Sequence, residues 1–235
     1  MATPRDYKNT IVPNWCPGCG DYGIQNAIQQ VCARKGWPNE SITLISGIGC
    51  SSRIGGYQYC YGAHTTHGRA LPFAQGIKCA NKDTHLIVCS GDGDSYAIGL
   101  GHAMHAMKRN MDITYLVFDN QVYGLTKGQT SPASSKGFVT KTTPDGNPLT
   151  PLNTADDMDV MKGQMVHTFV AQGYAVDGKN LPDIIEKAVD HKGFSYVNIF
   201  TPCVTFNHMN TVQWYNEHLK KIEDVQHLPI CNFRF

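Results

Sequence analysis

The sequence predicts an α/β protein with a parallel sheet and helices on both faces. Between residues 41 and 120, strand-like apolar runs alternate with helical segments through short connections, which is typical of βαβ units. The runs LIVC and ITYLVF contain no charged residue, as expected for strands that are buried on both faces. The chain has 235 residues, enough for one large domain or two small ones.

The first predicted helix covers residues 21–36. Ile24, Ile28 and Val31 repeat at helical spacing and therefore fall on one face, which the helix can bury. Gly36 supplies a typical stop signal.

The central part of the chain supplies the alternating pattern. We expect a short strand at 41–46, a helix at 70–81, a strand at 85–90, a helix at 95–110 and a strand at 111–120. The glycine-rich loop GIGCSSRIGGY follows the first of these strands.

The last third of the chain is less regular. Residues 128–155 are rich in Thr, Ser, Pro and Gly and predict a long loop, which in a compact domain is usually functional or a partner contact. We expect helices at 155–173 and 181–193 and a strand at 194–200, whereas the final 30 residues show no strong pattern. The simplest organisation is one α/β domain at 1–200 and a short C-terminal extension at 201–235.

Composition narrows the class of protein. The net charge is +1, so neither nucleic acid nor an acidic membrane surface is favoured as a partner. The polar start MATPRDYKNT has no apolar signal region, and no run of apolar residues is long enough to span a membrane. We expect a soluble, cytoplasmic protein.

The chain contains nine cysteines, an odd and high number for a reducing compartment. This count favours metal ligation by some of them over a disulfide framework. The stretch WCPGCGDYG holds Cys16 and Cys19 in Cys-x-x-Cys spacing. By itself this spacing fits zinc, an iron–sulfur cluster, disulfide exchange or plain packing.

The strongest local arrangement is a strand that ends in GDGD and a following strand that ends in Asp119-Asn120. In a parallel βαβ unit both strand ends meet at the carboxyl edge of the sheet, so Asp92 and Asn120 can converge. A carboxylate and an amide oxygen suit Mg²⁺, and glycines before a helix N-terminus suit phosphate. The alternative is an ordinary Gly/Asp turn at a strand end.

This arrangement resembles the Mg²⁺–diphosphate motif of thiamine-diphosphate enzymes. Five further stretches of the sequence restrict the resemblance to one family among these enzymes: WCPGCGDYGI, GIGCSSR, HGRALPFAQGIKCAN, DNQVYGLTKGQTSP and HKGFSYVNIFTPCVTFN. Together they look like the β subunit of 2-oxoacid:ferredoxin oxidoreductases over about residues 10–210. The resemblance implies the thiamine-diphosphate-binding (PP-type) fold.

The resemblance also implies a [4Fe–4S] cluster held by four cysteines. The positions that match its motif are Cys16, Cys19, Cys50 and Cys203, all in loops that contain Gly, Pro or Ser. Structural zinc is the alternative for a Cys₄ site. The other cysteines are expected to pack as small hydrophobes (Cys32, Cys79, Cys89) or are left undecided (Cys60, Cys231).

For the cofactor, the resemblance implies Mg²⁺ ligation by Asp92, Asn120 and the carbonyl of Val122. Further residues are expected to bind thiamine diphosphate: Gly49, Cys50, Ser51, Ser52, His67, Gly91, Gly93, Asp94, Gly124, Leu125 and Thr126.

Three residues are expected to act on the substrate side of the site. Arg53 and Lys127 match positions where the family has basic residues that face substrate carboxylates or CoA, although each also fits a solvated surface charge. His67, in the block AHTTHGR that begins with Ala63 and His64, is expected near the active site; a hydrogen-bonded histidine at a helix start is the alternative.

The implied reaction is the CoA-dependent oxidative decarboxylation of a 2-oxoacid through a thiamine diphosphate enamine, with electrons passed by the cluster to ferredoxin. The block TPCVTFN favours 2-oxoglutarate, while pyruvate and branched-chain 2-oxoacids stay open. Two other classes remain: a non-redox thiamine-diphosphate decarboxylase subunit, which leaves the cysteines unused, and a zinc-stapled, non-catalytic module, which leaves the Mg²⁺ motif unused.

The resemblance finally implies a partner. The glutamate that activates the cofactor's pyrimidine ring is supplied by a separate α subunit in this family, and nothing in the sequence resembles a second α/β domain. We therefore expect an αβ or (αβ)₂ heteromer.

Overall fold

The computed structural model describes residues 2–152, 167–221 and 233–234. Its centre is a parallel six-stranded sheet in the order β2-β1-β3-β4-β6-β5, which confirms the predicted α/β class. The strands are β1 (Ile42–Ser46), β2 (Tyr61–His64), β3 (His85–Gly91), β4 (Ile113–Asp119), β5 (Phe169–Tyr174) and β6 (Phe194–Phe200). A short antiparallel pair, β7 (Lys220–Lys221) and β8 (Phe233–Arg234), lies outside this sheet.

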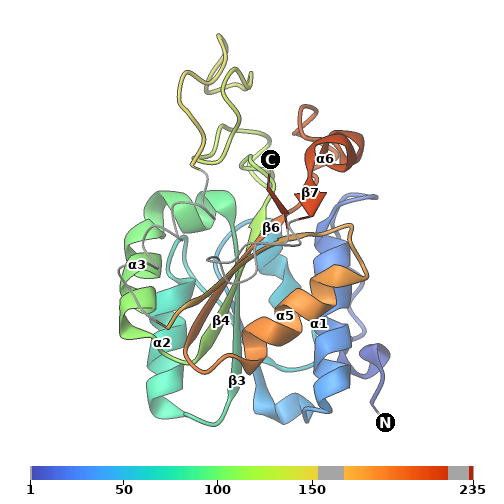
Figure 1. Ribbon diagram of the computed structural model, residues 1–235, viewed down its shortest axis with the longest axis vertical. Coiled ribbons are helices and arrows are strands. Elements are labelled where there is room, and N and C mark those ends of the chain that lie inside the picture. Colours follow the sequence, from blue (N-terminus) through green and yellow to red (C-terminus); the bar gives the residue numbers. More distant parts are fainter. Residues whose placement is uncertain (1, 153–166, 222–232, 235) are drawn as a thin grey trace.

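Helices cover both faces of the sheet. Helices α1 (Asp21–Lys35) and α5 (Asn180–Asp190) lie on one face, and α2 (Ala70–Ala80) and α3 (Leu100–Arg109) on the other (Figure 1). Two hydrophobic clusters fill the two layers between sheet and helices. Shorter elements are η1 (Pro4–Tyr7), η2 (Asn39–Ser41), η3 (Ser51–Tyr57), the π-helical turn η4 (Asp94–Ile98) and α6 (Val212–His218).

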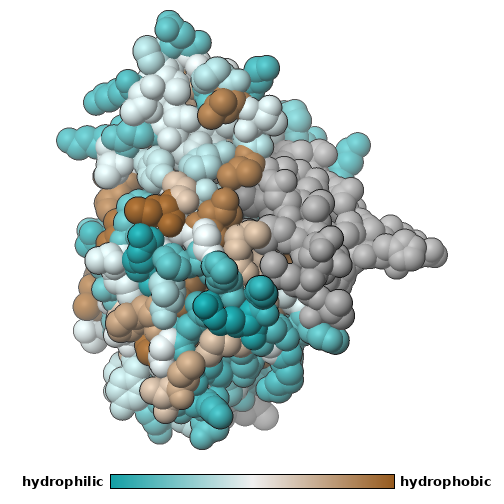
Figure 2. Space-filling model, turned by 90° about the vertical axis from the view of Figure 1, so that its left-hand side faces the viewer, coloured by the Kyte–Doolittle hydropathy of each residue, from teal (hydrophilic) through white to brown (hydrophobic). Residues whose placement is uncertain are grey.

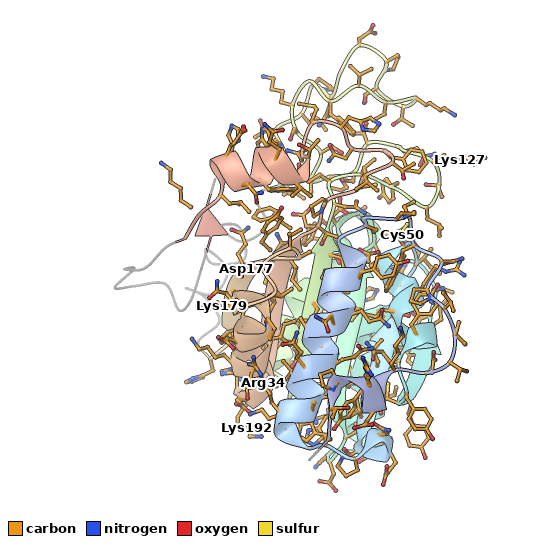
Figure 3. All side chains as sticks on the ribbon, turned by 90° about the vertical axis from the view of Figure 1, so that its right-hand side faces the viewer. Arg34, Cys50, Lys127, Asp177, Lys179 and Lys192 are labelled. Carbon is orange, nitrogen blue, oxygen red and sulfur yellow. The ribbon has the colours of Figure 1, made fainter. Side chains whose placement is uncertain are left out.

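Strands β4 and β6 form the middle of the core. Every residue of both strands is buried, as the run ITYLVF predicts for β4, and in β6 this burial includes the polar residues Ser195 and Asn198. On the outer side, Arg34 of α1 pairs with Asp183 of α5 at 2.7 Å, and Lys35 pairs with Asp190 at 2.5 Å. Figure 3 shows Arg34 on this face. These exposed pairs contribute little to stability compared with the burial beneath them.

The predicted helix at 155–173 is wrong where the structure describes it. Residues 169–173 belong to β5, in which Phe169 pairs with Ser195 of β6, and residues 155–166 lie outside the described residues. All six residues of β5 are buried, so ladder hydrogen bonds to β6 and burial on both faces outweigh the helical spacing of the sequence. The predicted helix at 95–110 is present but begins as the π-helical turn η4.

Strand β2 and helix α6 are among the elements that were not predicted from the sequence. Strand β2 is an edge strand with a mostly exposed surface, so its composition carries no core pattern. Helix α6 follows Thr211, whose hydroxyl accepts a hydrogen bond from the Trp214 amide as a typical N-cap. Tyr215 of this helix packs on Tyr174 and Phe200 at the carboxyl end of the sheet.

The predicted long loop leaves the carboxyl end of β4 and projects beyond the sheet at the top of Figure 1. The division of the chain after residue 200 stays a prediction; in the structure, β6 ends at Phe200. None of the helices among the described residues has the length and apolar character needed to span a membrane.

Candidate functional site

The carboxyl edge of the sheet brings the two polar strand ends together. Strands β3 and β4 are neighbours, with Gly91 opposite Phe118, so Asp92 and Asn120 follow at adjacent strand ends. They line a cavity of about 70 Å³, which we call the Asp92 pocket. Its lining comprises Ile48, Gly49, Cys50, Ser51, His67, Gly91, Asp92, Gly93, Asp94, Asn120, Val122, Tyr123, Gly124, Leu125 and Thr126.

Asp92 is a buried carboxylate with few donors. It is 1% exposed, and it accepts hydrogen bonds from the Ser131 hydroxyl and from the backbone N–H of Asn120. Burial, followed by the neighbouring Asp119 carboxylate, raises the pKa of Asp92 well above its ordinary value. An ionised Asp92 therefore needs nearby positive charge, and a hard divalent cation with oxygen ligands fits this place.

Asp119 neighbours Asp92 and is held by a series of hydrogen bonds between buried side chains. The side-chain amide of Asn198 donates to Asp119 Oδ2 at 3.1 Å, and its Oδ1 accepts from the Tyr96 hydroxyl at 2.6 Å. Burial raises the pKa of Asp119 to about 7. These contacts fix Asp119 at the end of β4, close enough to Asp92 for the two carboxylates to interact.

Asp94 connects the loops around the pocket. Its carboxylate accepts from the backbone amides of Ile48 at 3.2 Å and Gly68 at 2.7 Å, and His67 Nδ1 lies 2.8 Å from its Oδ1. Asp94 also lines the pocket, but its carboxylate is aimed at these loops. Its role in the structure is therefore to position the glycine-rich loop after β1 against the turn η4.

Gly47 makes this close contact possible, and a methyl group there tests it. A Cβ at Gly47 would lie 1.8 Å from Asp94 Oδ2, inside van der Waals contact. We expect Gly47→Ala to lower the free energy of unfolding by about 1–3 kcal/mol, the usual cost of overpacking. Denaturant unfolding measures it. Gly56→Ala is the matched control, because a Cβ there meets nothing within 4 Å; equal stability of the two variants would contradict the contact.

The four predicted cluster cysteines line a second cavity, of about 180 Å³, which we call the cysteine pocket. Three separate loops supply them: the turn before α1, the loop after β1 and the loop after β6. The lining comprises Asn14, Trp15, Cys16, Cys19, Cys50, Arg53, Asn120, Gly124, Leu125, Cys203, Val204, Thr205 and Phe206.

Burial dominates the acidity of the thiols in this pocket, and at Cys50 the Arg53 guanidinium opposes it only as the smallest contribution. Burial raises the pKa of Cys50 to about 12, and it also raises the pKa of Cys19 and of Cys203. Against burial, backbone N–H groups of the loop after Cys203 hydrogen-bond its sulfur and lower that pKa. The Thr205 hydroxyl donates to Cys16 Sγ at 3.1 Å. Thiolates here would need a metal centre to balance their charge.

The arrangement of the cysteines bears on the kind of metal centre that they could hold. Among the residues that the structure describes, no three His, Cys, Asp or Glu side chains are placed to share one metal ion. A zinc ion needs its sulfurs about 2.3 Å away on all sides. The four cysteines all line one cavity.

The two pockets share one wall. Cys50, Asn120, Gly124 and Leu125 line both of them. Gly124 keeps this wall thin, since a Cβ there would lie 3.6 Å from Cys203 Sγ and 3.7 Å from Cys50 Sγ. Figure 3 shows Cys50 at the upper end of the sheet, where the pockets meet.

The predicted substrate-side residues are only partly brought together. His67 lines the Asp92 pocket, and Arg53 lines the cysteine pocket, where its Nε donates to the Tyr57 hydroxyl at 3.1 Å. Lys127 lines neither pocket; it is exposed on the turn above Cys50 (Figure 3). Ser52 does not line the Asp92 pocket but faces a groove on the other side of η3, with Arg53 and His64.

Of the three cysteines that were expected to pack, two do so. Cys32 and Cys89 are buried in the core, and Cys60 packs against it. Cys79 is exposed on α2, so the prediction that it packs is wrong; its helix turns this position to the outer surface. Cys231 lies outside the described residues.

Several residues of the site were missed by sequence reasoning. Ser131 reaches Asp92 from the long loop, and Thr205 reaches Cys16 from the loop after β6. Trp15 donates from its indole N–H to the Cys50 carbonyl at 2.7 Å and so ties two cysteine loops together. A serine or threonine in a polar loop cannot be recognised as a site residue from the sequence. Trp15 could have been, because it is a large aromatic residue directly before Cys16.

Fold and site together define a thiamine-diphosphate-binding protein. The family described as "Thiamine pyrophosphate enzyme, C-terminal TPP binding domain" matches residues 47–199, more than half of the chain. A second family, which describes the C-terminal part of the pyruvate ferredoxin oxidoreductase β chain, matches residues 203–230.

Related proteins that match nearly the whole chain identify the family more closely. The "2-oxoacid:ferredoxin oxidoreductase subunit beta" of Saccharolobus solfataricus is 44% identical over 90% of this chain and 68% of its own length. The "2-oxoglutarate synthase subunit KorB" of Archaeoglobus fulgidus is 38% identical over 94% of this chain and 81% of its own length. The chain belongs to the β subunits of the 2-oxoacid:ferredoxin oxidoreductases.

A solved structure agrees with this assignment. It is described as "2-oxoglutarate:ferredoxin oxidoreductase from Magnetococcus marinus with 2-oxoglutarate, coenzyme A and succinyl-CoA bound". The match has a TM-score of 0.92 and 37% identity, and it covers 99% of this chain and 84% of that chain. The oxidoreductase assignment is therefore favoured over a non-redox decarboxylase subunit and over a zinc-stapled module, and an α subunit is the implied partner.

Proposed function

We propose that this β subunit holds thiamine diphosphate and a [4Fe–4S] cluster in adjoining pockets, and that with its α subunit it performs the CoA-dependent oxidative decarboxylation of a 2-oxoacid with ferredoxin as electron acceptor. The observation that carries this proposal is the wall shared by the Asp92 and cysteine pockets. Only the residues that line both pockets, Gly124 among them, would separate the two cofactors, and this short separation suits electron transfer.

The residues of the Asp92 pocket fit a magnesium-bound diphosphate. Asp92, Asn120 and the carbonyl of Val122 would hold Mg²⁺, with the charge of the cation offsetting the buried carboxylate. The backbone of Gly91 and Gly93 lets phosphate oxygens approach closely. When bound, thiamine diphosphate supplies the electron sink that makes loss of CO₂ from a 2-oxoacid possible.

The chain's own residues set the surroundings of that chemistry. Asp94 holds His67 beside the pocket, and the Tyr123 hydroxyl donates to the Gly93 carbonyl at 3.1 Å and closes one side. His67 can hold or pass a proton at Nε2 while its Nδ1 faces Asp94. These contacts keep the glycine turn rigid, as tight phosphate binding requires.

The residues of the cysteine pocket fit an iron–sulfur cluster. Cys16, Cys19, Cys50 and Cys203 would ligate it, and its iron would balance thiolates whose pKa burial otherwise raises. The loop amides around Cys203 and the Thr205 hydroxyl already point at the sulfurs.

The favoured substrate is 2-oxoglutarate. Two similar proteins support this choice: a relative described as a 2-oxoglutarate synthase subunit, and the solved 2-oxoglutarate:ferredoxin oxidoreductase with 2-oxoglutarate and coenzyme A bound. Arg53 beside the cysteine pocket would suit a substrate carboxylate, and Lys127 at the rim would suit CoA or a carboxylate. The described cysteines are free thiols, which fits the reducing cytoplasm.

The proposal is tested with the α and β subunits expressed together and purified as a complex without oxygen. We expect ferredoxin reduction that requires both CoA and 2-oxoglutarate and is faster with 2-oxoglutarate than with pyruvate. Release of CO₂ without ferredoxin reduction would instead assign the non-redox decarboxylase class.

The hydrogen bond from the Thr205 hydroxyl to the Cys16 sulfur is expected to affect the reduction potential of the proposed cluster. Hydrogen bonds to cluster sulfurs raise the reduction potential, and a net bond of about 1 kcal/mol corresponds to roughly 40 mV for a one-electron couple. We expect Thr205→Val to lower the potential by about this amount in an EPR-monitored redox titration. Thr10→Val, at an exposed threonine, is the control. An unshifted potential in the Thr205 variant would exclude the contact.

A further inference from the structure

The loop after β6 contains two buried asparagines. This loop, residues 203–210, begins with the proposed cluster ligand Cys203, and we call it the Cys203 loop. Half of its residues are exposed, yet Asn207 is 2% exposed and Asn210 is 3% exposed. A buried amide is costly unless its polar atoms find partners, so the partners of Asn207 show what its burial achieves.

The side chain of Asn207 uses its full capacity for hydrogen bonds. Its Nδ2 donates to the Asn120 carbonyl at 3.0 Å and to Asn210 Oδ1 at 3.1 Å. Its Oδ1 accepts from the backbone amides of Met209 at 3.1 Å and Asn210 at 3.0 Å. A side-chain amide has two N–H donors and an oxygen with two lone pairs, so these four bonds hold Asn207 in one orientation.

One of the four bonds reaches the proposed cation site. Asn120 is a proposed Mg²⁺ ligand, and its Oδ1 accepts from the Val122 amide at 3.1 Å. The bond from Asn207 holds the backbone oxygen of the same residue, from 87 positions further along the chain. Asn120 is thus held at two atoms, once by its own turn and once by the Cys203 loop. Asn207 acts on the cation position through Asn120.

The backbone of Asn207 serves the cluster side. Its N–H donates to the Cys203 carbonyl at 3.2 Å. Burial raises the pKa of Cys203, and the N–H groups of Phe206, Thr205 and Asn207 oppose this rise by hydrogen-bonding the Cys203 sulfur. Hydrogen bonds to cluster sulfurs help to set the reduction potential of an iron–sulfur cluster. One residue therefore connects a proposed Mg²⁺ ligand to a proposed cluster ligand.

Packing strengthens the same connection. Phe206 lies against the turn after Val122: Gly128 has a φ of 88°, and a Cβ there would lie 3.1 Å from Phe206 Cδ1. The long loop that follows this turn carries few hydrophobic side chains on the face shown in Figure 2. Such a loop offers little apolar burial to hold the residues after β4 in place, so contacts from the Cys203 loop carry more of that task.

We propose that Asn207 is a positioning residue shared by the two pockets: its side chain holds Asn120 for the cation, and its backbone amide holds Cys203 for the cluster. The inference rests on the proposed function, which assigns Mg²⁺–thiamine diphosphate and the cluster to these pockets. It adds that a change at this one buried residue alters both sites, although Asn207 is not among the residues that line either pocket.

The first test is Asn207→Ser in the αβ complex purified without oxygen. Serine can still accept from the amides of the turn, but it is too short to reach the Asn120 carbonyl, and it adds no charge. We expect the Mg²⁺ concentration for half-maximal thiamine diphosphate binding to rise at least about 10-fold, as when an outer partner of a metal ligand is lost. Excess Mg²⁺ should restore full binding, because the ligands remain. Isothermal titration measures both effects.

The same sample tests the cluster side. We expect Asn207→Ser to keep its iron and to show a lower cluster reduction potential in an EPR-monitored redox titration, since the loosened loop weakens the N–H bond to the Cys203 sulfur. A second variant, Asn207→Asp, keeps the size of the side chain and its accepted bonds but lacks the donor, so it too should need at least about 10-fold more Mg²⁺.

Asn210→Ser is the matched control. It removes a partner of Asn207 within the same loop and leaves the bond to Asn120, so its Mg²⁺ requirement should stay within twofold of the unchanged complex. The proposal is overturned if both Asn207 variants also stay within twofold, if Asn210→Ser matches them, or if excess Mg²⁺ fails to restore binding. A change at only one of the two sites overturns the shared role. Absence of cofactor binding by the unchanged complex would refute the proposed function itself, and this inference with it.

Discussion

Replacing Asp92 by Asn will abolish thiamine diphosphate binding and 2-oxoacid turnover while the chain still folds. The carboxylate is 1% exposed, and Mg²⁺ would be held by Asp92 between cofactor and protein. Loss of a partner that merely orients a metal ligand costs about 10–100-fold in metal affinity. Loss of the ligand charge itself is therefore expected to weaken Mg²⁺-dependent cofactor binding by more than about 100-fold.

Isothermal titration of the αβ complex with thiamine diphosphate, at several Mg²⁺ concentrations, measures this effect. The variant should fold normally, because a neutral amide of the same size replaces a carboxylate whose pKa burial already raises. Asp83→Asn, at an exposed carboxylate before β3, is the control and should leave binding unchanged. Cofactor affinity within threefold of the unchanged complex would show that Asp92 is not the cation ligand.

Replacing Cys203 by Ala will remove the cluster and leave the cofactor. Cys203 lines only the cysteine pocket, so the partners of the diphosphate stay in place. We expect iron content and visible absorbance to fall to background, ferredoxin reduction to fall by more than about 10³-fold, and thiamine content to stay at one per chain. Iron analysis and thiamine assay on the same anaerobic sample measure both.

Cys50→Ala is the companion variant. Because Cys50 lines both pockets, it should lose the cluster and also weaken cofactor binding. Cys79→Ala, at the exposed cysteine of α2, is the control and keeps its iron. If Cys203→Ala retains its iron, the cluster of the complex resides elsewhere, for example on the α subunit.

The central βαβ unit could be predicted because its signals are local. Apolar runs identify β3 and β4 as buried strands, and polar residues directly after them must meet at one edge of a parallel sheet. The convergence of Asp92 and Asn120 followed from topology alone. Strand β5 could not be predicted in this way. Its residues have helical spacing, but burial and pairing with β6 make them a strand.

Many residues that line the two pockets could be predicted from the sequence, but the residues that support them could not. The four cysteines were chosen from their loops and from the family resemblance, and the structure gathers all four around one cavity. Ser131 and Thr205 come from loops whose path depends on the folded chain, so no pattern marks them. Asp94 lines the Asp92 pocket, and nothing in the sequence indicated that its carboxylate also binds the loops after β1 and β2.

The proposal that the Asp92 pocket and the cysteine pocket hold two cofactors is tested most directly by the composition of the αβ complex purified without oxygen. Iron, sulfide, zinc and thiamine are counted on one sample, for the unchanged complex and for the Cys203→Ala variant. We predict about four iron, about four sulfide and about one thiamine in each β subunit, all iron being lost in the variant. A colourless complex with about one zinc in each β subunit would contradict the account.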